Sequence, residues 1–197
     1  MQPQTFIFFG QVGSGKGTQV KLLQDFLKAR DDKDCAYIGT GEIFRKIIEA
    51  PDGNLDAHKV KEMLNAGQLI PDEMTNKLVA DAMEKQISSE RHVIFDGYPR
   101  TVVQAEFFEE KVKFYQREDI KIIYIELTEE EAMKRNLLRG RHDDTREGLA
   151  KRFNEYKDKV LPAMNYFKEK ENYTIFTING EQTIENVHKD IVKALGF

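Results

Sequence analysis

The residue types best suited to chemistry stand in a glycine-rich segment near the start of the chain. Residues 10–18 read GQVGSGKGT, and the spacing from Gly10 to Gly15-Lys16 is that of a phosphate-binding P-loop. Glycines allow a turn whose backbone N–H groups all point inward around an anion, and the dipole of the following helix adds to them. Lys16 then reaches the outer phosphates of a nucleoside triphosphate. We therefore predict a nucleotide-binding loop rather than a glycine-rich turn without a ligand.

One detail of this loop departs from the general P-loop pattern. The lysine is followed by Gly17, and the hydroxyl that usually stands there comes one residue later, at Thr18. The case for direct Mg²⁺ ligation by that hydroxyl is therefore weaker than in the general motif. The guanine-binding Asn-Lys-x-Asp motif is missing, since Asn76-Lys77 is followed by Leu78-Val79. This argues against a switch GTPase.

Arginines accompany the other motif-like segments of the chain. Arginine grips phosphate oxygens with a planar fork of donors, and its charge does not titrate away. A single arginine is most often part of a surface salt bridge, but we expect six that accompany one P-loop to serve phosphate groups. They are Arg45, Arg100, Arg135, Arg139, Arg141 and Arg152.

Short apolar runs rich in β-branched and aromatic residues must position these side chains. Stretches with helical spacing separate the runs, which lie at residues 5–9, 35–38, 93–95, 120–127 and 173–178. The alternation predicts an α/β fold with a mostly parallel sheet covered on both faces. Small, flexible and charged residues follow four of the runs, in the segments 10–18, 39–41, 96–100 and 179–180. Ligands of such sheets bind beyond the carboxyl ends of the strands, so we expect one site there.

In this order and over essentially the whole chain, the motifs resemble those of the adenylate kinase family. The resemblance is carried by residues 10–19, 40–42 with Arg45, 96–100 with Gln104, 135–152 and 179–180. It implies a single P-loop NTPase-type domain, residues 1–197, with a five-stranded parallel sheet flanked by helices. The core would comprise residues 1–38, 73–137 and 145–197. A nucleoside-monophosphate-binding insertion would comprise residues 39–72, and a short lid residues 138–144.

The resemblance also implies the reaction, reversible phosphoryl transfer from Mg-ATP to AMP giving two ADP, and the residues that serve it. The ATP side would be formed by Gly13, Ser14, Gly15, Lys16, Gly17, Thr18, Arg135, Arg139 and Gln182. The AMP side would be formed by Thr40, Arg45, Gln68, Leu69, Ile70, Gly97, Tyr98, Pro99, Arg100, Gln104, Arg141 and Arg152. Transfer would depend on Lys16, Arg100, Arg139, Arg141 and Arg152. Asp96 would orient Mg²⁺ through water.

The lid is the part that departs most from the family pattern. Only Gly140 separates Arg139 from Arg141, and the segment contains no cysteine, which excludes a zinc-bearing lid. Phosphoryl transfer needs charge neutralisation and exclusion of water, and arginines that arrive with a closing lid supply both.

Two other functions stay open on the sequence alone. A related kinase would phosphorylate CMP or UMP, and a regulatory module would bind nucleotide without turnover. Gln104 favours AMP, because one amide pairs with both the acceptor and the donor of the adenine edge. Lys16 and the arginine set argue against a module without turnover.

Composition narrows the class of protein further. The 30 basic and 34 acidic residues give a net charge of −4, which argues against binding nucleic acid or membranes by bulk charge. Cys35 is the only cysteine, so an internal disulfide and a multi-cysteine metal site are excluded. The chain shows no signal-peptide pattern and no apolar run of membrane-spanning length. We expect a cytoplasmic monomer whose partners are ATP, AMP and ADP.

Overall fold

A computed structural model describes residues 2–49, 55–140 and 145–197 of the chain. Its sheet contains the parallel strands β1 (Thr5–Phe9), β2 (Cys35–Gly39), β3 (His92–Asp96), β4 (Ile120–Glu126) and β5 (Tyr173–Asn179), in the order β2-β3-β1-β4-β5. Each strand agrees with its predicted run to within one residue at either end. The predicted fold class, a five-stranded parallel sheet flanked by helices, is confirmed.

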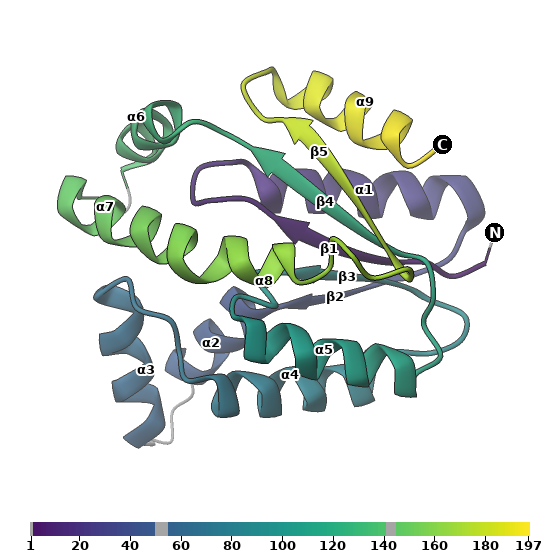
Figure 1. The fold of residues 1–197 in the computed structure, drawn as a ribbon, viewed down its shortest axis with the longest axis horizontal. Helices are drawn as coiled ribbons and strands as arrows, with labels where there is room; N and C mark the ends of the chain where they lie inside the picture. Colours follow the sequence, from purple (N-terminus) through teal and green to yellow (C-terminus); the bar gives the residue numbers. More distant parts are fainter. Residues whose placement is uncertain (1, 50–54, 141–144) are drawn as a thin grey trace.

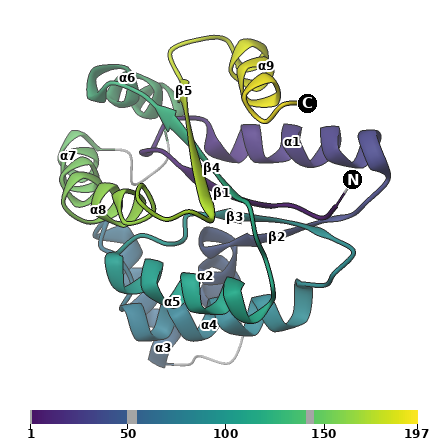
Figure 2. The ribbon, with the colours of Figure 1, turned by 45° about the vertical axis from the view of Figure 1, so that its right-hand side comes forward.

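Helices cover both faces of this sheet. On one face α1 (Lys16–Asp31) and α9 (Ile184–Ala194) pack against it, and on the other lie α4 (Asp72–Gln86), α5 (Val102–Phe114) and α8 (Leu161–Asn165) (Figures 1 and 2). Strand β1 shows why both layers form, since Phe6 and Phe8 belong to the first core and Ile7 and Phe9 to the second. Successive side chains of a strand point to opposite faces, so a strand apolar at every position needs cover on both.

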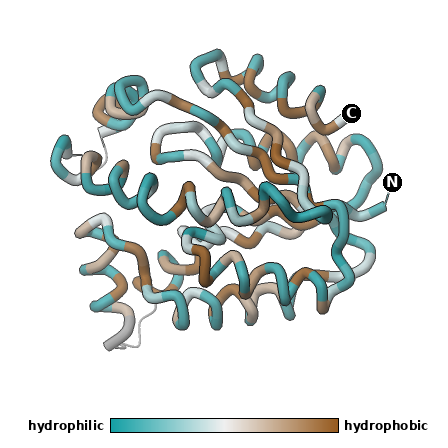
Figure 3. The backbone as a smooth tube through the Cα atoms, viewed as in Figure 1, coloured by the Kyte–Doolittle hydropathy of each residue, from teal (hydrophilic) through white to brown (hydrophobic). Residues whose placement is uncertain are grey.

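Apolar residues are concentrated along the strands and the inner sides of these helices (Figure 3). Among the described residues, no helix combines the length and the apolar character that crossing a membrane would require.

Two smaller helical units stand beside the carboxyl ends of the strands (Figure 1). Helices α2 (Thr40–Glu49) and α3 (Leu55–Asn65) pack around Phe44, Val60 and Ile70. Helices α6 (Glu129–Arg139) and α7 (Arg146–Glu155) pack around an apolar cluster of their own, formed by Leu127, Ala132, Leu149 and Phe153. Each unit therefore has its own small core, separate from the two cores of the sheet.

Helix α7 continues into a wider turn before α8. The spacing of Leu149, Phe153, Tyr156 and Val160 predicts one continuous α-helix, but η1 (Tyr156–Val160) is a π-helix. Pro162 gives the physical reason, because a proline has no N–H to donate to the carbonyl four residues earlier and its ring collides with that carbonyl. The wider turn therefore accommodates the proline. Tyr156 and Val160 line a cavity at the carboxyl edge of the sheet, and Val160 also packs against the core of the sheet.

Candidate active site

The glycine-rich loop joins β1 to α1 at the centre of the carboxyl edge. Gly13 has a φ of 87°, and a Cβ there would collide with Nδ2 of Asn136 and lie 3.1 Å from the carbonyl oxygen of Ala132. Only glycine suits both the backbone angle and the close approach of α6. The amide of Gln11 anchors the loop from the other side, since Nε2 donates to the carbonyl oxygen of Leu127 at 2.6 Å. The loop is thus held open by its contacts with the junction of β4 and α6.

The Lys16 side chain folds back over this loop. Its Nζ donates to the carbonyl oxygens of Gly10 and Gln11, the latter at 3.2 Å. Burial lowers the pKa of Lys16 to about 8, the Asp96 carboxylate opposes that shift, and the charges of Arg100 and Arg139 reinforce it. The lysine therefore stands in a site short of negative charge, which is what bound phosphates would supply.

The segment after β3 supplies the facing cation. Arg100 donates from Nε to the carbonyl oxygen of Gly97 at 2.8 Å, and the Thr40 hydroxyl donates to the same oxygen at 2.8 Å. Burial lowers the pKa of Arg100, while Asp96 and Glu155 oppose that shift. The peptide bond between Tyr98 and Pro99 is cis. These contacts fix the Arg100 guanidinium between the end of β3 and the start of α2.

A cavity of about 360 Å³ connects these elements. It opens between the P-loop, the α2–α3 unit and the start of η1, and it brings together residues that lie far apart in the sequence. The predicted site residues that line it are Lys16, Arg45, Gln68, Leu69, Gly97, Pro99, Arg100 and Arg152. Four cationic side chains from four different elements therefore border one cavity, which suits a polyanionic ligand.

Several predicted residues lie behind the cavity wall. Thr40 and Ile70 are buried, and the ring of Tyr98 packs in the core of the sheet, where its hydroxyl donates to Oδ1 of Asn76 at 2.7 Å. Gln104 is also buried, with Oε1 accepting from the backbone N–H of Arg100 and Nε2 donating to Asp72, both at 2.8 Å. Reading an adenine edge would require Gln104 to exchange these protein partners, so that role stays a prediction.

The remaining predicted residues on the ATP side lie around the loop rather than in the cavity. Gly15, Gly17 and Thr18 are exposed at the start of α1, whereas Ser14 is buried in the loop. Arg139 ends α6, with Gly140 as the C-cap, and its charge acts on Lys16. Arg135 forms an ion pair with Glu131 at 2.8 Å. Gln182 donates to Asp190 at 2.8 Å and to the carbonyl oxygen of Asn179 at 3.0 Å. Arg141 lies outside the described residues.

The sequence does not mark the functional candidates on α7, η1 and β2. Glu155 at the end of α7 and Tyr156 at the start of η1 line the cavity beside Arg152, in a stretch whose periodicity predicts only an ordinary amphipathic helix. Tyr37 lies within the apolar run 35–38, but its hydroxyl donates to Oδ2 of Asp96 at 3.1 Å. No sequence signal marks that contact, since the two residues are 59 positions apart.

The donor atoms around Asp96 fit a magnesium ion that arrives with a nucleotide. Among the described residues, no group of three or more His, Cys, Asp or Glu side chains could hold a metal ion. Mg²⁺ dehydrates reluctantly and is usually held by one or two carboxylates together with substrate phosphates and water. A single carboxylate at the end of β3, beside the phosphate-binding loop, matches this requirement.

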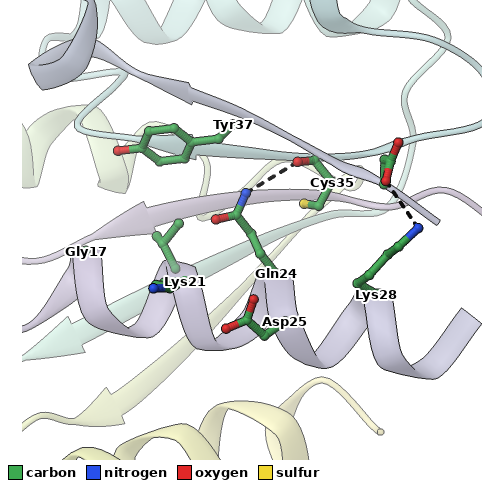
Figure 4. Close-up of a pocket in the computed structure, with 9 residues that line it drawn as sticks. Gly17, Lys21, Gln24, Asp25, Lys28, Cys35 and Tyr37 are labelled. Carbon is green, nitrogen blue, oxygen red and sulfur yellow. Dashed lines mark hydrogen bonds and ion pairs between the residues drawn. The ribbon is translucent and has the colours of Figure 1, made fainter. Parts of the chain in front are cut away.

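A second hollow, of about 460 Å³, lies between α1 and β2. Its lining includes Lys21, Gln24, Cys35 and one side of the Tyr37 ring (Figure 4). It carries acidic and basic side chains together and stands beside the P-loop rather than in front of it. The cavity with four cationic side chains is therefore the candidate active site.

A parallel sheet with a P-loop after its first strand and arginines around the facing cavity defines a nucleotide-dependent phosphotransferase. The comparisons with known proteins agree, since the adenylate kinase family model matches residues 8–172. The chain belongs to the adenylate kinase family. Adenylate kinase 1 of Nostoc sp. is 31% identical over 192 residues, which cover 96% of this chain and 97% of the relative. Adenylate kinase of Corynebacterium diphtheriae is 32% identical over 190 residues, with 96% and 98% covered.

The family assignment identifies the chain as an enzyme, a phosphotransferase. It supports the adenylate kinase interpretation over a CMP or UMP kinase and over a nucleotide-binding module without turnover.

Proposed function

We propose that the protein transfers the terminal phosphoryl group of Mg-ATP to AMP, reversibly, and so forms two ADP. The observation that carries the proposal is the cavity of about 360 Å³ in which Lys16 faces Arg45, Arg100 and Arg152. Two polyanions approach each other only where fixed cations surround the gap between them. A cavity with cations from four elements meets that need, and no side chain has to act as a covalent catalyst.

On the donor side, the inward backbone N–H groups of Gly13–Thr18 would hold the phosphates, and Lys16 would move from the loop carbonyls to the outer phosphates. Arg135, Arg139 and Gln182 would complete the ATP side from α6 and the loop after β5. Asp96 would hold the hydrated Mg²⁺, which supplies charge neutralisation on the phosphates when it is bound.

On the acceptor side, Arg45 and Arg100 would bind the AMP phosphate beside Gly97. The Gln68–Ile70 segment and Thr40 would form the wall behind the nucleoside, with Gln104 next to the base. Arg152 lines the same cavity and would contact the group in transit, together with Arg141. In-line transfer depends on this positioning more than on proton movement.

We propose residues 39–72 and 138–144 as the parts that close over the substrates. The supporting observation is that the α2–α3 unit and the α6–α7 unit each carry a small core of their own. Such units move without breaking the cores of the sheet. Closure would keep water away from the transferred group and so favour transfer to AMP over hydrolysis of ATP.

The test is an assay of purified protein with Mg-ATP and AMP, CMP, UMP, GMP or no acceptor. We expect ADP to form with AMP and a small rate with the other nucleotides. A preference for CMP or UMP would overturn the assignment of the acceptor. Loss of ATP without any acceptor would overturn the proposal that the short lid excludes water.

One variant serves as the control for this assay. Lys16→Ala is expected to abolish transfer with an unchanged circular dichroism spectrum, and near-normal turnover would refute the role of the P-loop. We also propose a cytoplasmic monomer, for which light scattering should give a mass near 22.9 kDa.

A further inference from the structure

Tyr37 reaches from the interior of β2 to the carboxyl edge of β3. In the register of these strands Tyr37 lies opposite Ile94, and Gly39 lies opposite Asp96. The tyrosine side chain therefore extends diagonally, over its own strand, to place its hydroxyl 3.1 Å from Oδ2 of Asp96. In Figure 4 the ring lies between β2 and α1, with its hydroxyl directed away from Cys35. The contact is a hydrogen bond that the tyrosine donates to the carboxylate.

Gly39 is the residue that makes this path possible. A Cβ at this position would overlap the hydroxyl of Tyr37 and lie 2.7 Å from its Cε1 atom. Gly39 is buried, and it is not among the glycines with positive φ, so its backbone angle does not call for glycine. The absence of a side chain at Gly39 therefore leaves the space that the Tyr37 ring occupies. The position of the ring depends on both residues.

Asp96 occupies a central electrostatic position in the site. Its charge favours the protonated form of both Lys16 on the donor side and Arg100 on the acceptor side. A carboxylate between two such cations can rotate toward either one. A hydroxyl donor that holds one carboxylate oxygen also fixes the direction of the other.

We propose that Tyr37, with the space left by Gly39, is a positioning residue that holds Asp96 in the orientation required for the hydrated Mg²⁺ of the nucleotide. The inference rests on the proposed function, in which Asp96 meets that ion. Tyr37 itself touches neither substrate nor metal and acts through the carboxylate.

The test compares nucleotide binding with and without the metal. Calorimetric titrations of ATP are carried out in excess Mg²⁺ and in EDTA, on wild type, Tyr37→Phe and Asp96→Asn. Tyr37→Phe removes one hydrogen bond to a charged group at a half-exposed site. We therefore expect it to weaken the binding of Mg-ATP about three- to tenfold. Binding of metal-free ATP should stay unchanged. The Mg²⁺ concentration for half-maximal transfer should rise by a similar factor.

Tyr173→Phe serves as the matched control. Tyr173 is a buried tyrosine at the start of β5, and its hydroxyl has no hydrogen-bond partner in the described part of the chain. Its loss is expected to leave both titrations unchanged. Gly39→Ala should displace the Tyr37 ring and reproduce the loss seen in Tyr37→Phe. An unaltered Mg-ATP affinity in Gly39→Ala would contradict the pairing of the two residues.

The outcomes separate the inference from the function on which it rests. If Asp96→Asn leaves the metal effect intact, the assignment of Asp96 fails. If Asp96→Asn removes that effect and Tyr37→Phe does not alter it, the inference about Tyr37 is overturned. Equal weakening of metal-free and Mg-ATP binding by Tyr37→Phe would show a merely structural role and overturn it as well. In the Asp96→Asn background, Tyr37→Phe is expected to cause no further loss.

Discussion

Replacing Lys16 by methionine should stabilise the ligand-free protein while it removes nucleotide binding. The ammonium group is held among the loop carbonyls, and burial lowers its pKa from 10.5 to about 8. In the unfolded chain the same group is fully hydrated and keeps its ordinary affinity for the proton. The folded state is therefore destabilised, because it holds a charge that is partly stripped of water.

The magnitude follows from the shift in the pKa of Lys16. A fall from 10.5 to about 8 corresponds to about 3 kcal/mol of destabilisation at neutral pH. Methionine also removes the two hydrogen bonds to Gly10 and Gln11, together about 1–2 kcal/mol. The net gain for Lys16→Met is then about 1–2 kcal/mol. For a chain of this length it should raise the Tm by about 3 to 6 °C.

The pH dependence gives a second check on the same reasoning. The lysine penalty is complete below pH 8 and shrinks as the pH rises toward 10.5, because the folded protein releases its proton first. The stability advantage of Lys16→Met should therefore decrease above pH 8. This advantage should vanish at about pH 9.5, where the remaining free-energy penalty of the lysine equals the free energy of the lost hydrogen bonds.

The assay is chemical and thermal unfolding of wild type and Lys16→Met at several pH values between 7 and 10, without nucleotide. Lys21→Met is the matched control, an exposed lysine on the same helix, and its effect should stay within about 0.5 kcal/mol. A Lys16→Met protein less stable than wild type at pH 7 would refute the argument. Equal stability at every pH would refute it as well.

Three further substitutions test other parts of the site. Gly13→Ala should abolish ATP binding and destabilise the protein by about 2–3 kcal/mol, measured by urea unfolding, because its Cβ collides with Asn136 at a positive φ. Gln104→Ala should raise the KM for AMP and weaken its preference over CMP; an unchanged preference would show that the amide only braces Arg100 and Asp72. Thr145→Ala removes the N-cap bond to Gly148 of α7 and should cost about 1 kcal/mol in denaturant unfolding; an unchanged midpoint would contradict the cap.

The architecture of the sheet could be predicted because its strands are buried on both faces. Such strands are dense apolar runs, so residues 5–9 and 120–127 differ from β1 and β4 by at most one residue. The carboxyl edge followed from the order of the elements, and that edge brings Lys16 and Arg100 to one cavity. These features depend on local composition and on the rules of parallel sheets.

Features that depend on contacts between distant residues were not predictable in this way. The wider turn at Tyr156–Val160 depends on how the chain accommodates Pro162, and the spacing of the apolar residues in the sequence does not mark it. The amide of Gln104 pairs with Asp72, 32 positions away, and the spacing of a motif does not indicate such a partner. Side-chain direction at the site is set by packing, which a sequence pattern does not contain.

The separate cores of the two units beside the site have a consequence for hydrogen exchange. Phe44, Val60 and Ile70 bury far less surface than the two cores of the sheet, so the free energy of opening the α2–α3 unit falls well below that of global unfolding. Amides of α3 should therefore exchange through local opening, at rates that denaturant hardly changes, whereas amides of β1 should exchange only when the whole chain unfolds. The stability of this unit therefore depends on a few side chains, and the sheet holds the P-loop in place when the unit opens.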